Sequence, residues 1–518
     1  MPTQPSASEA LTPAFYTWAG LLPWLLGLWI GLLVGLPWLG PWSVSPQPNT
    51  LPLLLSWACT GLLLLCAARI KPLDVARAWA WAALISSALG LIQYFGAASV
   101  LSPWLHVPQA LGEASANLRQ RNLLASLLAI GCLAVLWWQA HGLKTRHALW
   151  MLALLAIGNA ATASRTGFFH MLLVLALSLY WFWLKPALAP HKAPGPSSPS
   201  AKGLAPHLAI WALLIYLLSN WALPSLLGTF SGQDMASAVA RMGQDEGCGS
   251  RAVLWGNVWH LIGQKPWTGW GWGELKYAHY ITAYGGGPAQ RFCDILGHAH
   301  NLPLHLAVTL GLPFTLGLGL LLLLGVARLR PWLSRLPDQQ LAWSVLAVIG
   351  LHSLLEFPLW YGPFQMAVLL CGVLLTAHTT SLKTRTATGL RLGFGSLILV
   401  VVCMLGADYA RASQIYLPAA QRWSFWRNQP LAAAQSSWFF QPSSRFAELT
   451  LTRVTPENAP WVLATSQDML HYSPEPQVVR LLLQSAQALG RQDLVSLHTA
   501  RWQAAFPSQP LPITQAGP

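Results

Sequence analysis

The stretch LGLPFTLGLGLLLLLGV, residues 310–326, contains no charged residue and is apolar along almost its whole length. A helix of this composition has no polar face to turn toward water, and roughly 20 such residues cross a hydrocarbon core of about 30 Å. A single segment in lipid must satisfy its own backbone hydrogen bonds, which only a helix achieves. We therefore predict that this stretch spans a membrane.

The same pattern recurs along the chain, because 54% of the 518 residues are hydrophobic and only 9% are charged. A soluble globular protein is far less apolar. We predict an all-α polytopic membrane protein with about eleven transmembrane helices, and Trp and Tyr at many span ends are typical of an interfacial belt. The other predicted spans lie near residues 18–39, 51–68, 78–100, 122–140, 148–163, 167–184, 208–227, 342–357, 363–379 and 392–407.

The net charge of +14 would suit a nucleic-acid partner, but its distribution indicates the lipid bilayer instead. Basic residues follow every even-numbered span, as Arg328 and Arg330 do after the stretch quoted above. Short loops rich in Lys and Arg remain in the cytoplasm. We therefore predict a bacterial inner-membrane protein with a cytoplasmic N-terminus, a periplasmic C-terminus and no nucleic-acid partner.

Two parts are predicted, a transmembrane domain over residues 1–407 and a periplasmic helical domain over 408–518. Residues 186–206 are rich in Pro, Ser, Lys and Ala and read as a flexible cytoplasmic linker. Residues 228–299 form a large periplasmic loop. In the tail, apolar residues recur at helical spacing over 478–489, which predicts helical hairpins of tetratricopeptide type. Such hairpins would either steady the last span or dock a protein acceptor.

Several polar sequences converge on the outer side of the membrane in this topology. Arg119, Arg121 and Arg165 are basic residues on the side that the charge bias disfavours, so they call for a separate reason. Snorkelling to lipid headgroups is one. Phosphate binding is the other, since Arg donates two parallel hydrogen bonds and helix N-termini carry unpaired N–H groups. The sequences are NLRQRN (117–122), SRTG (164–167), GSRAVLWGNVWHLIG (249–263), KPWTGWGWGEL (265–275) and HAHN (298–301).

The third of these sequences predicts a helix that begins at Arg251 with Ser250 as its N-cap. Its apolar positions would lay it along the membrane surface, with Arg251 directed into the same anion-binding zone. The glycines and indoles that follow allow close backbone approach and offer flat faces, which stack on sugar rings or anchor in the interface. The sequence thus predicts a site for a lipid-linked pyrophosphate.

Two histidines, His298 and His300, stand just before Asn301 and a helix expected to begin near Leu302. A neutral imidazole beside an anion-stabilising region suits a general base, because its proton affinity lies near working pH. A metal site is the alternative, since His305 adds a third imidazole. The spacing matches no zinc motif and lacks an adjacent carboxylate. We predict no metal and no cofactor, and leave the base as either histidine.

A carboxylate at the outer end of the ninth predicted span needs a partner of its own. The sequence EFPLWYGPF, residues 356–364, places Glu356 there, close to Trp360 and Tyr361 at the following turn. A buried carboxylate is costly unless it is paired. We predict that Glu356 either pairs with one of the arginines or orients an imidazole.

Cys248 and Cys293 both lie in the periplasmic loop. The periplasm is oxidising, and thiols there form disulfides readily. We predict a disulfide between these two residues.

Together these motifs resemble one family, the bacterial O-antigen ligase and polymerase superfamily. HAHNLPLHLAVTLGLP (298–313) is similar to its histidine motif, and NLRQRN, SRTG and the SRAVLW to PWTGWGWG segment are similar to further signatures. EFPLWYGPF is most typical of the protein-targeting O-oligosaccharyltransferases that glycosylate pilins. The resemblance extends over residues 117–407, and more loosely over the tail.

The resemblance implies that residues 1–407 form a metal-independent glycosyltransferase domain with its catalytic loop at 228–299. It implies that an undecaprenyl-pyrophosphate-linked glycan is transferred en bloc to Ser or Thr hydroxyls of a periplasmic, pilin-like protein. Arg165 and Arg251 would contact the pyrophosphate, and His300 or His298 would activate the hydroxyl. The other residues predicted at the site are Arg119 and Arg121 for the pyrophosphate, and Asn301, Gln120, Asn122, Glu356 and Tyr361 in support.

Two other functions remain open at this point. An O-antigen ligase or polymerase would use the same donor but a saccharide acceptor. A lipid or solute transporter would show ionisable groups at mid-membrane or interrupted helices in matching halves. The polar residues of this chain gather at one face instead, which favours transfer over transport.

Overall fold

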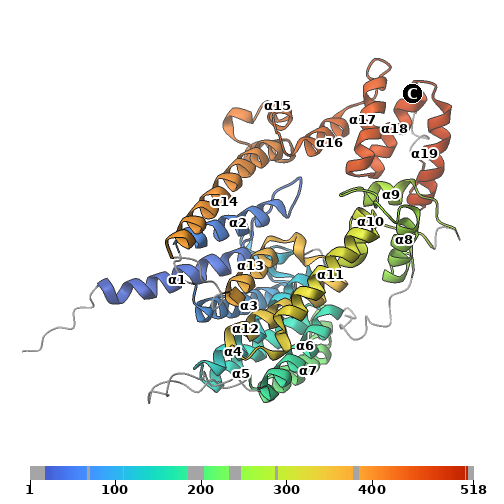
Figure 1. The fold of residues 1–518 in the computed structure, drawn as a ribbon. Coiled ribbons are helices and arrows are strands. Elements are labelled where there is room, and N and C mark those ends of the chain that lie inside the picture. Colours follow the sequence, from blue (N-terminus) through green and yellow to red (C-terminus); the bar gives the residue numbers. More distant parts are fainter. Residues whose placement is uncertain are drawn as a thin grey trace, which may run out of the picture.

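The computed structural model of the protein describes residues 18–66, 70–108, 110–184, 204–232, 247–285, 290–376, 384–507 and 509–511. Throughout these residues the regular secondary structure is helical and includes no strand, which confirms the predicted all-α class (Figure 1). Most of the predicted linker, residues 186–203, lies outside the described residues. Its last residue, Pro206, is already the first residue of α7.

Apolar helices make up the membrane region. Among the described residues, six are long and apolar enough to cross a membrane, and three more are apolar but shorter. These nine, together with α5 and α12, overlap the predicted spans, although α3 begins and ends six residues earlier than the span predicted at 78–100. The chain is therefore a multi-pass membrane protein whose number of crossings stays a prediction. The helices are α1 (Trp18–Leu39), α2 (Thr50–Cys66), α3 (Pro72–Tyr94), α4 (Arg121–Ala140), α5 (Thr145–Ala161), α6 (Arg165–Trp183), α7 (Pro206–Ser231), α11 (Leu312–Leu329), α12 (Pro337–Leu355), α13 (Gly362–Thr376) and α14 (Thr384–Ser413).

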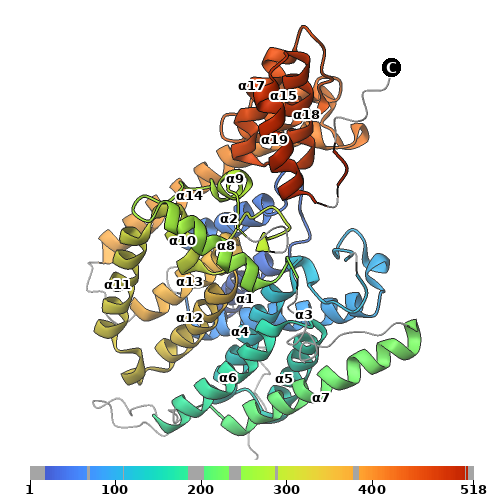
Figure 2. The same cartoon turned by 90° about the vertical axis from the view of Figure 1, so that its right-hand side faces the viewer.

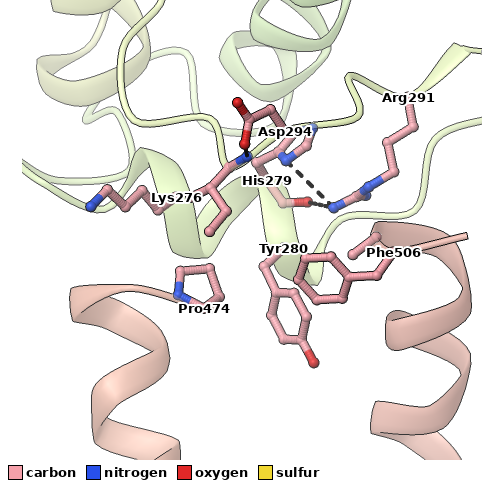
Figure 3. A pocket seen from close by; sticks show the side chains of 9 residues that line it. Lys276, His279, Tyr280, Arg291, Asp294, Pro474 and Phe506 are labelled. Carbon is pink, nitrogen blue, oxygen red and sulfur yellow. Dashed lines mark hydrogen bonds between the residues drawn. The ribbon is translucent and has the colours of Figure 1, made fainter. Parts of the chain in front are cut away.

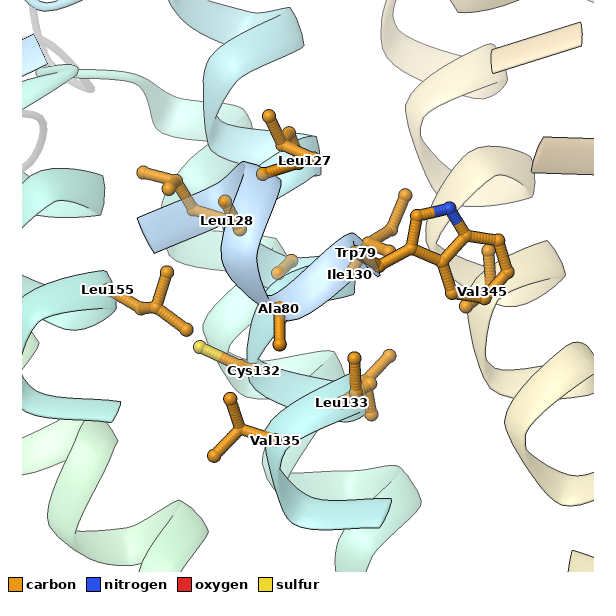
Figure 4. Close-up of a cluster of buried hydrophobic side chains, with 14 of the residues drawn as sticks. Trp79, Ala80, Leu127, Leu128, Ile130, Cys132, Leu133, Val135, Leu155 and Val345 are labelled. Carbon is orange, nitrogen blue, oxygen red and sulfur yellow. The ribbon is translucent and has the colours of Figure 1, made fainter. Parts of the chain in front are cut away.

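Helix α4 lies at the centre of the bundle. Its most apolar 18-residue window is 89% buried, whereas the corresponding windows of α11 and α14 are 0% and 6% buried. Trp79 of α3, Leu155 of α5 and Val345 of α12 pack around Leu128 and its neighbours on α4 (Figure 4). A helix that is apolar on all sides is buried in protein or faces lipid, and α4 and α11 exemplify the two cases. The central position of α4 holds its N-terminal end, Arg121 and Asn122, in the middle of the bundle.

The predicted eighth span needs a correction. A separate helix, α10 (Leu302–Leu310), precedes α11, and the chain breaks at Gly311, whose φ is 87°. The left-handed conformation favours glycine, and a Cβ at this position would collide with the carbonyl group of Trp267. The HAHN motif therefore stands before the short α10, so the helix N-terminus beside the histidines does not belong to a spanning helix.

Helices α8 (Arg251–Gln264), α9 (Leu275–Ile281) and α10 lie between the membrane bundle and the C-terminal helices (Figure 1, Figure 2). After α14 the chain forms further helices. The apolar spacing predicted over 478–489 is the buried face of α18 as far as Ala486, whereas Leu489 follows the helix and is exposed. Trp502 of α19 and Tyr280 of α9 join the same core. The C-terminal helices, predicted as a domain of their own, are thus packed directly on the segment that carries the polar motifs. These helices are α15 (Pro430–Gln435), α16 (Gln441–Leu451), α17 (Ala459–Tyr472), α18 (Pro476–Ala488) and α19 (Gln492–Ala505).

Candidate active site

The carboxylate of Glu356 joins three of the predicted motifs. Its side chain, at the end of α12, is only 6% exposed. Arg251 Nη2 donates to Oε1 at 2.7 Å, Asn122 Nδ2 donates to Oε1 at 2.9 Å, and His300 Nδ1 lies 2.6 Å from Oε2. A buried carboxylate is tolerated where a counter-charge and hydrogen bonds surround it. Glu356 therefore does both things that the sequence left as alternatives, since it pairs with an arginine and contacts an imidazole.

Asn122 carries the network on to the start of α6. Its Oδ1 accepts a hydrogen bond of 2.6 Å from Ser164 Oγ, while its amide N–H faces Glu356. The Ser164 hydroxyl also caps α6 by accepting from Gly167 N at 3.2 Å. Arg165 follows Ser164 as the first residue of that helix. The NLRQRN and SRTG motifs thus meet at one point, beside the carboxylate.

The remaining residues of NLRQRN have other partners in this structure. Arg121 Nη1 lies 2.9 Å from Glu113 Oε1, and Arg119 Nη2 donates to the carbonyl oxygen of Pro41 at 2.9 Å. Arg119 has a left-handed backbone, with φ at 61°. Gln120 Oε1 is buried and accepts no hydrogen bond from the described residues. The Glu356 network therefore includes Arg251 but neither Arg119 nor Arg121, whose pyrophosphate contacts stay a prediction.

The two histidines have different surroundings. His300 has a left-handed backbone, with φ at 50°, and its side chain is 33% exposed. With Nδ1 turned to Glu356, its Nε2 is the nitrogen left to accept a proton. His298 is stacked on Phe357, with ring centroids 4.1 Å apart, and its Nδ1 is buried without a partner among the described residues. Burial, and then the charges of His305 and its other basic neighbours, lower the pKa of His298 to about 3.

Hydrogen bonds from both sides hold the HAHN segment in place. Asn301 caps α10, since its Oδ1 accepts from Leu304 N at 3.0 Å, and its Nδ2 donates to Leu354 O on α12 at 2.9 Å. From α8, the indole N–H of Trp255 donates to Ala299 O at 3.0 Å. The predicted support by Asn301 is therefore structural, because it fixes α10 against the helix that carries Glu356.

Aromatic rings border the two histidines. Trp360 lies 5.2 Å from His298 between ring centroids, and Trp272 stacks on Trp360 at 5.8 Å with an angle of 8°. Trp272 is 61% exposed. Tyr361 stacks on Phe357, and burial, reinforced by the charge of Glu356, raises the pKa of its phenol. Flat, exposed rings beside polar groups are the surfaces on which sugar rings stack.

The backbone of the GWGWG segment is packed against the end of α10. Trp270 N donates to Val308 O at 2.9 Å, and Gly271 N donates to Thr309 O at 3.0 Å. Gly269 has φ at 66°, and a Cβ on it would lie 2.4 Å from the carbonyl carbon of Thr309. Only glycine allows this approach, so the motif fixes the loop to the histidine segment.

Gly269→Ala is therefore expected to destabilise the fold by at least about 2 kcal/mol, because it combines backbone strain with a backbone clash. The measurement is the thermal unfolding midpoint of the purified protein in detergent. Gly256→Ala is the matched control, since Gly256 lies within α8 with nothing within 4 Å of a new Cβ. That control should gain about 0.5 to 1 kcal/mol of helix stability. Equal midpoints for the two variants would refute the close-packing argument.

The structure joins Cys248 and Cys293 in a disulfide, with Cα atoms 5.3 Å apart. The bridge joins two residues 45 positions apart and ties the segment just before Arg251 to the segment that contains Arg291. Ser250 caps α8 as predicted, accepting from Val253 N at 3.3 Å. The start of α8, and with it Arg251, is therefore anchored by a covalent bond and a cap.

Among the described residues, no group of three or more His, Cys, Asp or Glu side chains is arranged to hold a metal ion. Of the three histidines of the HAHNLPLH sequence, His298 and His305 have ring centroids 5.2 Å apart, but His305 Nδ1 faces the N–H of Ala299 and His300 Nδ1 faces Glu356. Metal independence stays a prediction.

A polar group inside the bundle was not predicted from the sequence. Ser126 Oγ on α4 lies 2.7 Å from His352 Nδ1 on α12 and 3.5 Å from His170 Nδ1 on α6. All three side chains are fully buried, one turn of helix below Asn122 and Glu356. Polar residues inside membrane helices are costly and generally have a role, so their presence in apolar spans was the available signal.

The amino-acid sequence matches three family models in succession. Residues 114–138 match the one described as Protein glycosylation ligase, 150–323 match O-Antigen ligase, and 340–516 match Virulence factor membrane-bound polymerase, C-terminal. The first two include the Asn122 and Ser164 motifs together with Arg251 and His300, and the third includes Glu356. The network described above is thus built from all three matched regions.

Two relatives from Acinetobacter baylyi carry related names. The General O-oligosaccharyltransferase is 24% identical over 363 residues, which are 67% of this chain and 57% of the relative. The ComP-specific O-oligosaccharyltransferase is 24% identical over 270 residues, 52% of this chain and 45% of the relative. The chain spans about half the length of these relatives, and no solved structure matches it. Over successive regions the chain is therefore similar to the O-antigen ligase family and to protein glycosylation ligases, which agrees with the resemblance drawn from its motifs.

Proposed function

We propose that this protein transfers a glycan en bloc from undecaprenyl pyrophosphate to a Ser or Thr hydroxyl of a periplasmic protein such as a pilin. The observation that carries the proposal is the shared carboxylate. Glu356 binds Arg251 and His300 at the same time. The proposed phosphate-binding group, Arg251, and the proposed base, His300, are therefore both held by one carboxylate. The names of the relatives and of the matched families support the same reaction class.

In the proposed reaction the acceptor oxygen attacks the anomeric carbon of the glycan. The bond from that carbon to the pyrophosphate oxygen breaks, and undecaprenyl pyrophosphate leaves with the bonding electrons. Arg251 and Arg165 stabilise the negative charge that develops on the leaving group, together with the N–H groups at the start of α6. Arg119 and Arg121 contribute to this zone in the proposal once the donor is bound.

The proton of the acceptor hydroxyl goes to His300 Nε2 in this proposal. Nδ1 keeps its own proton and donates it to Glu356, which fixes the tautomer and stabilises the imidazolium that forms. Asn122 in turn orients Glu356, and Asn301 holds the segment that carries the base. Trp272 and Trp360 offer stacking surfaces for the sugar rings. The chemistry proceeds on the periplasmic face of the inner membrane, and neither a metal nor a cofactor takes part.

The test is incubation of the purified protein with an undecaprenyl-pyrophosphate-linked glycan and separate acceptors, a pilin-like protein and an acceptor saccharide, with mass spectrometry of the products. The pilin-like protein is expected to gain the mass of one whole glycan, with or without a chelator present. Product on the saccharide alone would make the chain an O-antigen ligase or polymerase. Loss of activity with the chelator, restored by a divalent metal, would contradict metal independence.

A further inference from the structure

A second cluster of charged and aromatic side chains lines a pocket between the periplasmic loop and the C-terminal domain (Figure 3). Lys276 and His279 come from α9, and Arg291 comes from the segment after it. Pro474 lies between α17 and α18, and Phe506 follows α19. The pocket has about 260 Å³ of empty space including its open mouth, and its enclosed part holds about one water-sized group. Such a space admits the tip of a side chain but not a sugar ring.

Arg291 is the unusual residue of this pocket. It is 5% exposed, and the groups that accept from its guanidinium are neutral, namely Thr282 O at 2.9 Å and His279 O at 2.8 Å. Nε is buried without a hydrogen-bond partner, and within the described residues no carboxylate forms an ion pair with Arg291. A buried charge without a counter-charge is strongly unfavourable unless something else compensates it. Arg291 therefore lacks an ion-pair partner of its own in the described part of the chain, although the carboxylate of Asp294 lines the same pocket.

The surroundings of Arg291 are rigid. Asn257 on α8 accepts from Phe292 N at 2.8 Å, donates to Gln290 O at 2.8 Å, and lies 3.3 Å from His279 Nε2. His279 Nδ1 is 3.4 Å from Arg291 Nη2, and burial, with the charge of Arg291, lowers the pKa of His279 to about 3. The imidazole is therefore neutral and adds no charge. Asn257 and the disulfide at Cys293 fix this cradle to the helix that begins with Arg251.

Lys276 connects the pocket with the candidate active site. Its Cε lies 3.4 Å from the place where a Cβ on Gly297 would stand, and its charge is among the causes that lower the pKa of His298. Burial lowers the pKa of Lys276 itself, and Glu475 opposes that effect. Asp294 also lines the pocket, and its Oδ1 accepts from the adjacent Ile295 N. Lys276 and Arg291 stand on opposite sides of the pocket (Figure 3).

We propose that this pocket binds a carboxylate side chain of the acceptor protein, close in sequence to the hydroxyl that receives the glycan. This inference rests on the proposed function and names the chemistry by which the acceptor is selected. Lys276 and Arg291 supply the charge, the narrow space admits only the carboxylate tip of an Asp or Glu side chain, and the shared wall at Gly297 places that side chain next to the histidines. The C-terminal domain completes the pocket and so takes part in acceptor recognition.

The experiment compares two acceptor peptides, one with Asp and one with Asn beside the target Ser. With the wild-type protein, the Asp peptide is expected to have a KM about tenfold lower, since a hydrogen-bonded charge contributes about that factor. Lys276→Met and Arg291→Gln should remove this preference while kcat for the Asn peptide stays within about twofold. Arg480→Gln is the control, because Arg480 is exposed on α18 and its loss changes the net charge equally.

Each outcome bears on one proposal. Equal KM values for the two peptides with the wild-type protein would overturn the acceptor pocket and leave the proposed transfer reaction standing. The KM could instead depend on an acidic sugar in the donor glycan and rise when the carboxylate of that sugar is reduced. This result would assign the pocket to the glycan and would also overturn the proposed acceptor pocket. If Arg291→Gln fails to fold, the deciding variant is Lys276→Glu. Its KM should be lower for a peptide with Lys beside the target Ser than for the peptide with Asp there. Absence of transfer to every acceptor would refute the proposed function itself.

Discussion

Glu356→Gln is expected to lower the rate constant of glycan transfer by a factor of about 10³ or more, because it reverses the orientation of the base. Gln can still accept from Arg251 and Asn122 through its oxygen. Its amide N–H group would then face His300 Nδ1, which lies 2.6 Å from the present carboxylate oxygen. Nδ1 would become an acceptor, Nε2 would carry the proton, and the nitrogen that faces the substrate would no longer accept one.

The measurement is kcat with saturating lipid-linked glycan and acceptor peptide, alongside the unfolding midpoint. Glu274→Gln is a matched control, since Glu274 Oε2 lies 2.7 Å from His471 Nδ1 in a more exposed carboxylate–histidine pair. An exposed pair contributes about 0 to 1 kcal/mol, so this control should retain nearly full activity. An active, folded Glu356→Gln protein would mean that the carboxylate only neutralises Arg251, and the proposed base mechanism would have to be abandoned.

The spans were predictable from the sequence because lipid imposes a strong rule on composition. Each apolar stretch became a helix, and the stretch at residues 310–326 failed only at its beginning, where Gly311 separates α10 from α11. Glycine occurs within many membrane helices, and what breaks the helix here is the close approach of Trp267 from another segment. Contacts of that kind are not visible in local sequence.

The sequence predicted that Asn122, Arg251 and His300 gather in one site, but not how they pair. Their meeting point on Glu356 depends on sequence separations of 234, 105 and 56 residues. The charge pattern also grouped Arg119 and Arg121 with them, because it carries no information on Pro41 or Glu113 as competing partners. Arg291 could not be singled out from the sequence for the same reason, because it belongs to no motif and only the structure shows that it is buried.

Asn122 shows how the site and the bundle depend on each other. The same side chain binds Glu356 and Ser164, and one turn further along the buried α4 is Ser126, which contacts His352. His352 lies one turn before Glu356 on α12, and its carbonyl oxygen accepts from Glu356 N at 2.7 Å. Two polar connections between α4 and α12 therefore fix the position of the Glu356 carboxylate along the axis of the bundle. A general base needs such fixed geometry, since proton transfer requires contact within hydrogen-bond distance.

His300→Ala should lower kcat for transfer by a factor of about 10² to 10⁴, the contribution usual for a general base. His298→Ala should lower it by less than about tenfold, because a histidine whose pKa is held near 3 is a weak proton acceptor. His298 is half-buried against Phe357, so its removal costs packing instead of proton transfer. Measurements of kcat and unfolding midpoints for both variants, with His471→Ala as a control outside the site, separate the two effects.

Added imidazole sharpens the comparison. The His300 side chain is 33% exposed, so the space left by His300→Ala is open to a small molecule from solution. Imidazole should restore part of the lost rate in His300→Ala and none in His298→Ala, whose deficit is one of packing. Restoration should follow the concentration of neutral imidazole, since only that form accepts a proton. A larger loss in a folded His298→Ala protein, rescued by imidazole, would assign the base to His298 and reduce the His300–Glu356 contact to a structural one.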